Sequence, residues 1–175
     1  AAFIYGALHL ELQDPVKRAP ALMTQTVHTE EGKKLTLAVV NPQAKQELYG
    51  LMSDIQKIMD QHQIPFWVSF GTLLGAVRHG GLIPWDDDLD ISIWEKDQKA
   101  FTALADDFKK QGITLDVRKS CMRLYRTDGR HVRPRKAVHL VGNVWFVTRH
   151  KERFPYCDVH MVKPEGDKNI YANPI

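Results

Sequence analysis

Acidic and apolar residues alternate along the segment 86–94, and this pattern constrains the fold more than any other feature. Its polar positions are Asp86, Asp88, Asp90 and Ser92, and its apolar positions are Leu89, Ile91 and Ile93. Successive side chains of a β-strand point to opposite faces, so the apolar set is predicted to enter a core and the acids to share the other face. Strands ordinarily exclude aspartate, and carboxylates on one face repel one another. The pattern therefore predicts a strand that binds a cation.

Oxygen-only ligands favour Mg²⁺ or Mn²⁺ over zinc. A second acidic strand supports this site, because in the segment 156–162 Asp158 and His160 lie opposite an apolar face. A pair of divalent cations needs more than two carboxylate ligands, and Asp158 is the candidate for a further one. For His160 a structural or supporting role is favoured over a catalytic one. The competing interpretation is an acidic turn that simply faces water.

Gly71 and Thr72 stand between a predicted strand, 66–70, and a predicted short helix, 73–78. Glycine permits close backbone approach to a phosphate, and amide N–H groups at the start of a helix bind anions. Gly71 and Thr72 are therefore candidate substrate-binding residues. The sequence His79-Gly80-Gly81 is typical of a helix end.

The remaining periodicities predict an α+β fold, a mixed β-sheet with helices packed on it. Asn41-Pro42 begins a helix of about 20 residues with one apolar stripe. A second helix is expected from Glu95 to Gln111. Further strands are expected at 113–119, 120–126, 137–147 and 156–162, with a turn at 127–130. Residues 1–40 are expected to form a β-rich lead-in with a hairpin turn at Glu31-Gly32, and residues 41–175 the main domain.

Basic residues are concentrated between Arg118 and Arg153. This stretch contains eleven lysines and arginines but only two acidic residues, although the net charge of the whole chain is only +3. This stretch favours an anionic ligand, and Arg123, beside Tyr125 on one strand face, is the candidate to bind it. The alternative is a solvated basic surface. The two cysteines are too few for a four-cysteine zinc site, and neither a P-loop nor an apolar run long enough to span a membrane is present.

The 22 residues from Phe70 to Ile91, FGTLLGAVRHGGLIPWDDDLDI, resemble the signature of the LicD family, which includes bacterial phosphocholine transferases and the fukutin-related proteins. The resemblance covers about residues 45–162. It implies a nucleotidyltransferase-like fold with a Gly-Thr turn, an Asp-x-Asp pair and a later acid. The matching residues here are Gly71, Thr72, Asp86, Asp88, Asp90 and Asp158, and Arg78-His79 matches the family's Arg-His pair.

The family implies metal-dependent transfer of a phospho-substituent, such as phosphocholine or a polyol or sugar phosphate, from a CDP-linked donor to a glycan hydroxyl. Asp88 and Asp90 would hold the metal with Asp86, and Asp158 would complete the site or act as general base. Arg78 and His79 would bind phosphate or brace the loop. Family domains usually continue further past the later acid, which leaves three alternatives open: a C-terminally truncated fragment, a compact family member, or a degenerate relative with an intact metal strand.

Two other functions remain open. A true nucleotidyltransferase would use the same carboxylates and release pyrophosphate, and a non-catalytic relative would bind glycan or RNA through the basic stretch, although the weak net charge makes nucleic acid the less favoured partner. The compartment depends on the source. A microbial or viral protein would be cytoplasmic, and a trimmed eukaryotic one would lie in the Golgi lumen.

Overall fold

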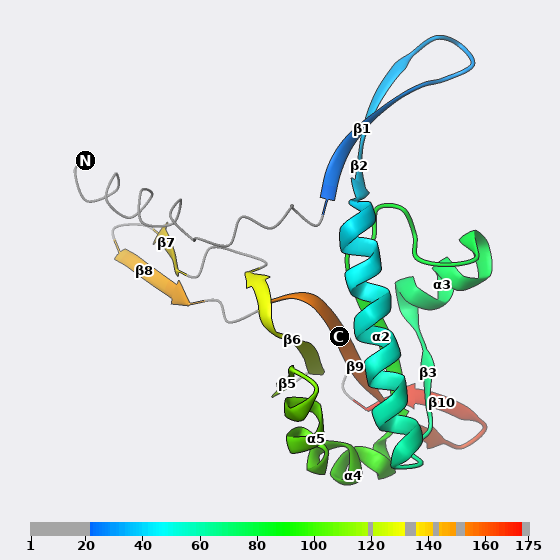
Figure 1. Cartoon of the computed structure of the whole chain (residues 1–175), viewed down its shortest axis with the longest axis vertical. Coiled ribbons are helices and arrows are strands. Elements are labelled where there is room, and N and C mark those ends of the chain that lie inside the picture. The colour runs from blue at the N-terminus through cyan, green and yellow to red at the C-terminus, as the bar shows by residue number, and fades with distance from the viewer. Residues whose placement is uncertain (1–21, 119–120, 132–135, 142–143, 150–152, 173–175) are drawn as a thin grey trace.

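The computed structural model describes residues 22–118, 121–131, 136–141, 144–149 and 153–172 (Figure 1). Its centre is a mixed sheet in the order β3-β4-β9-β6-β5, with β10 also pairing with β9. The strands are β3 (Phe66–Val68), β4 (Leu89–Trp94), β5 (Ile113–Val117), β6 (Met122–His131), β9 (Arg153–Glu165) and β10 (Lys168–Tyr171). β4 and β9 run parallel, and the other pairs are antiparallel. With the helices that cover it, this sheet confirms the predicted α+β class.

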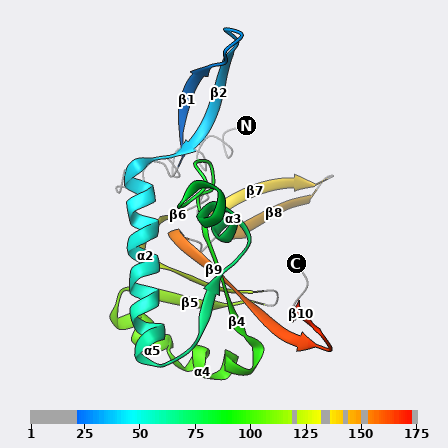
Figure 2. The same ribbon diagram turned by 90° about the vertical axis from the view of Figure 1, so that its right-hand side faces the viewer.

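Helix α2 (Pro42–Gln61) packs along β9 and covers one face of the sheet (Figure 2). It begins as predicted, because the side chain of Asn41 accepts a hydrogen bond from the Gln43 backbone N–H and Pro42 takes the first helical position. Its buried stripe repeats at helical spacing: Ala44, Leu48, Leu51, Ile55, Ile58 and Met59. In the described residues, no helix is both long and apolar enough to cross a membrane.

The register of β4 on β9 explains why the sheet has a core face and a polar face. Leu89 pairs with Cys157 and Ile91 with Val159, and all four side chains are buried beneath the helices. The alternate positions of both strands therefore face the other side of the sheet, where the acids lie. Burial also raises the pKa of the Cys157 thiol far above its usual value, so Cys157 behaves as a core residue.

Helix α3 (Phe70–His79) lies beside β4 and ends, as predicted, at a left-handed Gly80. Its start differs from the prediction. The strand β3 stops at Val68, Ser69 is the N-terminal cap position, and Gly71 and Thr72 lie in the first helical turn instead of breaking a strand. The hydrogen bond from the Leu73 N–H to the Ser69 carbonyl closes this turn.

Three other predicted elements were wrong in detail. The expected helix 95–111 is divided into η1 (Glu95–Asp97), α4 (Gln98–Ala103) and α5 (Ala105–Lys110), because the chain leaves helical geometry at Leu104. The expected strand 137–147 is a hairpin of β7 (Lys136–Val141) and β8 (Val144–Arg149). The expected turn 127–130 is an irregularity within β6, where its register on β9 shifts.

The lead-in contains β1 (Leu22–His28) and β2 (Lys34–Val40), a hairpin that projects beyond the end of α2 (Figure 1). Gly32, with φ 76°, supplies the left-handed residue of the predicted turn. A hydrogen bond from the Val40 N–H to the Pro84 carbonyl, at 2.6 Å, fastens the base of the hairpin to the main domain. Residues 1–21 of the lead-in lie outside the described part, and the division at residue 40 stays a prediction.

Gly129 and Gly50 provide a matched test of this packing. A Cβ at Gly129 would overlap the Phe154 carbonyl oxygen, whereas a Cβ at Gly50, on the exposed side of α2, would meet nothing within 4 Å. We expect Gly129→Ala to lower the free energy of unfolding by about 1–3 kcal/mol. Gly50→Ala should raise it by about 0.5–1 kcal/mol. Denaturant unfolding measures both, and shifts of the same sign would contradict the predicted bulge packing.

Candidate active site

The acids lie at the N-terminal end of β4 and in the loop before it. The strand begins at Leu89, so Asp90 is a strand residue, whereas Asp86, Asp87 and Asp88 belong to the loop. The predicted alternation from Asp86 onwards was therefore wrong for the loop residues. The competing prediction of a turn is correct for their backbone, but all three side chains are half-buried and do not simply face water.

The start of α3 fixes the backbone of Asp90 on both sides. The Asp90 N–H donates to the Thr72 hydroxyl at 2.8 Å, and the Asp90 carbonyl accepts from the Ser69 N–H at 3.0 Å. A buried hydrogen bond between the Ser92 and Ser69 hydroxyls, at 3.0 Å, continues this contact. Thr72, predicted as a substrate-binding residue, thus uses its hydroxyl to position β4. Ser69 was not identified from the sequence.

Gly71 lies directly against the acidic loop. A Cβ at this position would overlap the Asp86 carboxylate, so only glycine permits this approach. The first turn of α3 therefore stands beside Asp86, and the partial positive charge of a helix N-terminus favours anions there. Close backbone approach was the predicted reason for a glycine at this place, and its neighbour proves to be a carboxylate of the same chain.

Asp158 is brought to the acids by strand register. It pairs with Asp90 across β4 and β9, and on its other side with Arg123 of β6. Both its oxygens are bound by the Arg123 guanidinium, with Nε and Nη2 each at 2.5 Å. Arg123 also lies over the Tyr156 ring, 4.1 Å from its centroid. Asp158 thus lies in the predicted place, but its partner in this structure is an arginine.

His160 lies one register step further along the same face. Its Nε2 is 3.2 Å from Asp90 Oδ1, and its ring packs edge-on against Phe70, with centroids 4.6 Å apart. Phe70 also stacks on Tyr171 of β10 at 4.9 Å. Phe70 has a φ of 44°, an unusual backbone conformation for a non-glycine residue. Nothing in the sequence indicated that Phe70 and Tyr171 lie beside His160. The pairing of β10 with β9 brings these three rings together.

Burial and neighbouring charges raise the pKa of two of these carboxyl groups, Asp86 and Asp88. Burial, followed by the charges of Asp90 and Asp86, raises the pKa of Asp88 to about 7. Burial also raises the pKa of Asp86, which shares a hydrogen bond with Asp88. Asp88 is therefore protonated at a higher pH than an ordinary aspartate, and its protonated form donates the hydrogen bond to Asp86. Asp87, predicted to turn away, still contributes its charge to the raised pKa of Asp86.

The side chains at this site are of the chemical type that binds a divalent cation. Within the described ranges no group of three or more His, Cys, Asp and Glu side chains already converges as a metal site. Burial and neighbouring charges nevertheless disfavour the ionised form of Asp88 beside Asp86, and Asp90 adds a third carboxylate, so positive charge is favoured at this place. The donor set is all oxygen, as Mg²⁺ and Mn²⁺ prefer. Asp158 could join it only by releasing Arg123.

Arg78 and His79 lie away from the acids, exposed in the last turn of α3. Arg78 Nε is 3.3 Å from His79 Nδ1, and both side chains lie near the Trp85 ring, which precedes Asp86. The pair thus contacts Trp85, the residue before the acidic loop, and not the acids themselves. Substrate binding by Arg78 and His79 stays a prediction.

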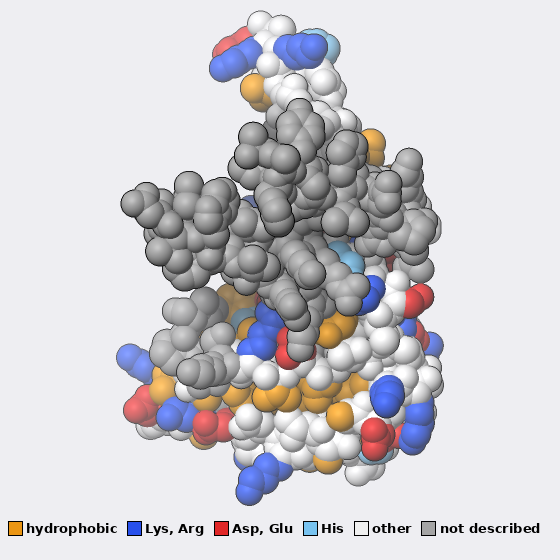
Figure 3. Space-filling model, turned by 90° about the vertical axis from the view of Figure 1, so that its left-hand side faces the viewer, with side chains coloured by type: hydrophobic (Ala, Val, Ile, Leu, Met, Phe, Trp, Pro, Cys, Tyr) orange, Lys and Arg blue, Asp and Glu red, His pale blue; other side chains and the backbone are white. Residues whose placement is uncertain are grey.

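The basic stretch is largely neutralised where the structure describes it. Arg118, Arg123, Arg126 and Arg130 form ion pairs with Asp116, Asp158, Asp54 and Glu47, respectively. Figure 3, which views the molecule from the side of β5 and β6, shows blue and red side chains interspersed rather than one basic patch. Arg133 and Arg135 lie outside the described residues. These pairs reduce the charge available to a nucleic acid.

Comparison with known proteins gives a family match. Residues 63–169 match the family model described as LicD/FKTN/FKRP, nucleotidyltransferase domain. An uncharacterised protein of Rickettsia prowazekii is 33% identical over 116 residues, which cover 62% of this chain and 42% of that protein. The lipopolysaccharide cholinephosphotransferase LicD of Haemophilus influenzae is 34% identical over 71 residues, 39% of this chain and 24% of LicD.

The human ribitol 5-phosphate transferase FKRP is 42% identical over 40 residues, 23% of this chain and 8% of FKRP. The matched segments therefore span less than half the length of each of these curated relatives. The similarity to transferases concerns this segment, and it includes the stretch that carries the acidic loop and β4.

The raised pKa of Asp88 predicts a pH-dependent stability. A carboxyl whose pKa rises from 3.8 unfolded to about 7 folded makes the fold less stable as pH rises through that window. Asparagine mimics the protonated acid, so without metal we expect Asp88→Asn to melt like the parent at pH 4. At pH 8 it should melt at least about 3 °C higher, since one pKa unit is about 1.4 kcal/mol. Thermal melts in EDTA across pH 4–8 measure this difference.

The control is Asp87→Asn, which removes the same charge from the same loop but not one of those that raise the pKa of Asp88. Its melting temperature should follow that of the parent much more closely. An equal rise in both variants, or a difference that does not change with pH, would refute the interpretation.

Proposed function

This chain belongs to the LicD/FKTN/FKRP nucleotidyltransferase-domain family, and from that premise we propose that it transfers a phospho-substituent from a CDP-linked donor to a glycan hydroxyl. The observation that supports this proposal is the set of half-buried carboxylates on Asp86, Asp88 and Asp90, in which burial and the charges of Asp90 and Asp86 raise the pKa of Asp88. Such an arrangement is unfavourable for folding and suits a site that binds a metal–diphosphate complex.

Asp86, Asp88 and Asp90 would hold Mg²⁺ or Mn²⁺, with Asp158 as a further ligand. The bound metal would neutralise the diphosphate and stabilise the charge of the departing nucleotide. The other residues of the site support these acids. Thr72 and Ser69 fix the Asp90 backbone, and His160 hydrogen-bonds the Asp90 carboxylate.

Arg123 and Asp158 would act as a pair. A bidentate guanidinium suits a phosphate as well as a carboxylate, so a donor diphosphate can compete with Asp158 for Arg123. Release of Asp158 would free a carboxylate on the same face as Asp90, either to complete the metal site or to accept the proton of the acceptor hydroxyl. Gly71 and Thr72, in the first turn of α3, would offer backbone N–H groups to the donor phosphates.

The relatives indicate the chemical class of the transferred group but not its identity. Their names specify choline phosphate and ribitol 5-phosphate, and we propose a phospho-alcohol of this kind for this chain. A nucleotidyltransferase that releases pyrophosphate would use the same carboxylates. Product analysis separates the two reactions, because phospho-substituent transfer releases CMP and nucleotidyl transfer from CTP releases pyrophosphate.

We expect Asp90→Asn to lower turnover by at least about a thousandfold, because the variant loses a metal ligand and the charge that positions the donor. The exposed Asp106→Asn on α5 is the charge-matched control and should retain full activity. Release of CMP from CDP-choline or CDP-ribitol in Mn²⁺ is the measurement. Full activity in Asp90→Asn would contradict the proposed site.

Donor binding can be measured without turnover. CDP-choline, CDP-ribitol, CDP and CTP, each with Mn²⁺, should be compared by thermal shift, and at least one should raise the melting temperature. No shift with any of the four would contradict a cytidine-nucleotide donor.

Gly71→Ala tests the contact between α3 and the acidic loop. The added methyl would displace the Asp86 carboxylate, so we expect the Mn²⁺ affinity to fall by about tenfold or more. Gly50→Ala, which meets nothing within 4 Å, should leave it unchanged. Isothermal titration with MnCl₂ measures the affinities, and an unchanged value in Gly71→Ala would exclude Asp86 as a ligand.

A further inference from the structure

The polar face of the sheet continues beyond the acids, along the strands β4 and β9. Register divides it into three successive rows on the same face: Asp90 with Asp158, Ser92 with His160, and Trp94 with Val162 and Tyr171. Four residues along a strand correspond to about 13 Å. The third row is therefore rigidly connected to the acids but lies about 13 Å away from them.

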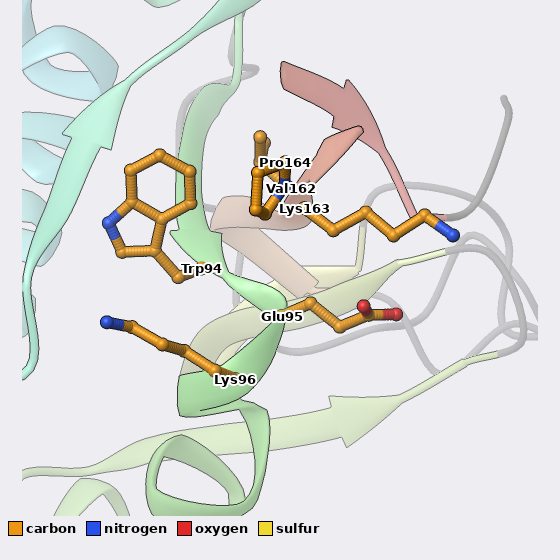
Figure 4. A pocket seen from close by; sticks show the side chains of 6 residues that line it. All are labelled: Trp94, Glu95, Lys96, Val162, Lys163 and Pro164. Atoms are coloured by element: carbon orange, nitrogen blue, oxygen red, sulfur yellow. The ribbon is translucent and has the colours of Figure 1, made fainter. Parts of the chain in front are cut away.

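A cavity of about 460 Å³ opens at this third row. It is lined by Trp94, Glu95, Lys96, Val162, Lys163 and Pro164. In Figure 4 the Trp94 ring, Val162 and Pro164 supply its apolar part, Lys96 extends to the same side as the Trp94 ring, and Glu95 and Lys163 extend to the opposite side. It thus combines an aromatic surface with hydrogen-bond donors and one carboxylate acceptor.

Further aromatic rings border this cavity. Trp67 of β3 packs against Trp94 with ring centroids 4.8 Å apart, and neither indole is buried. Tyr171, on the other side of Val162, is 38% exposed and stacked on Phe70, which is itself 38% exposed. Because these exposed rings pack against one another, they are already ordered, and a ligand can contact them at little cost in conformational entropy.

We propose that this third row is a subsite for a sugar ring of the acceptor glycan, removed by more than one sugar unit from the hydroxyl that receives the phospho-substituent. The inference rests on the proposed function and names the part of the chain that would hold the acceptor. The apolar face of a pyranose ring would stack on Trp94. Its hydroxyl groups would accept hydrogen bonds from Lys96, whose side chain extends to the same side as the Trp94 ring.

The position favours a glycan over the donor's cytosine. The donor diphosphate is confined to the acids, and the row of Ser92 and His160, covered by Phe70, lies between them and the cavity. The rim residues Glu95, Lys96 and Pro164 are exposed, so a ligand can continue beyond the subsite, as a polymer does. The positive charge of Lys96, on the same side as the Trp94 ring, also accepts an acidic sugar.

Binding of chitohexaose and of a hyaluronan hexasaccharide, as neutral and acidic probes, tests the proposal by isothermal titration on the full chain. We expect at least one probe to bind both the parent and Asp90→Asn, since the subsite is distant from the metal ligands. Trp94→Ala should weaken that binding by about tenfold or more, and Trp94→Phe, which keeps an aromatic ring, by no more than about threefold. If neither probe binds, or if Trp94→Ala binds like the parent, the proposal is wrong.

The donor provides the second readout. The thermal shift produced by CDP-choline with Mn²⁺ should be the same in Trp94→Ala as in the parent, and its loss would assign the cavity to the nucleotide and overturn the proposal. If the proposed function is wrong, the result differs: no cytidine compound raises the melting temperature of the parent protein, whether or not the oligosaccharides bind. An unchanged circular dichroism spectrum excludes misfolding of Trp94→Ala. If that variant does not fold, Lys96→Ala at the exposed rim provides the test: it should weaken oligosaccharide binding, and parent-like binding would contradict the proposal.

Discussion

Electrostatic repulsion among half-buried carboxylates is the constraint on which the rest of this structure depends. The core face of β4 is filled by Leu89, Ile91 and Ile93, so Asp90 has to lie on the opposite face. There the charges of Asp86, Asp90 and Asp158 all oppose the ionisation of Asp88. Burial alone would already raise the pKa of a carboxyl group, and the neighbouring charges raise it further. The fold tolerates this cluster because each acid is provided with something that offsets its charge.

The compensation comes from four directions. Burial and neighbouring charges favour a proton on Asp88, which is shared with Asp86 through their hydrogen bond, and the N-terminal turn of α3 approaches Asp86 through Gly71. His160 hydrogen-bonds Asp90, and Arg123 binds both oxygens of Asp158. A cation would take over the role of the shared proton, and a phosphate would compete for the arginine. The fold thus contains internal substitutes for the two charges that a metal–diphosphate complex would bring, so exchange with that complex would replace one set of charges by a similar one.

Local patterns allowed part of this structure to be predicted from the sequence. The helix α2 was predicted because its cap and apolar stripe are local signals, and the core side of β4 because its alternation is short and regular. The partner of Asp158 was not predicted, since the register of β6 on β9 places Arg123 there and β-sheet register is a long-range property. The break at Leu104 and the helical start at Phe70 were also missed, because tertiary packing there overrides local propensity. Alternation alone favoured a metal site at the acids but left an acidic turn open as the alternative, and the family resemblance added the expected role of each residue.

The strand β4 connects the acids to the proposed glycan subsite without any flexible segment between them. Its first residues carry the carboxylate chemistry and its last residue, Trp94, borders the cavity. A strand paired on both sides cannot change its length, so the separation between the two is set by the rise per residue. A glycan stacked on Trp94 would therefore present only a hydroxyl at one fixed distance along its chain to the acids. Acceptor specificity would then arise from the geometry of the sheet rather than from contacts with the reacting sugar, which explains how a sheet face with so few polar side chains beside the acids could still select its substrate.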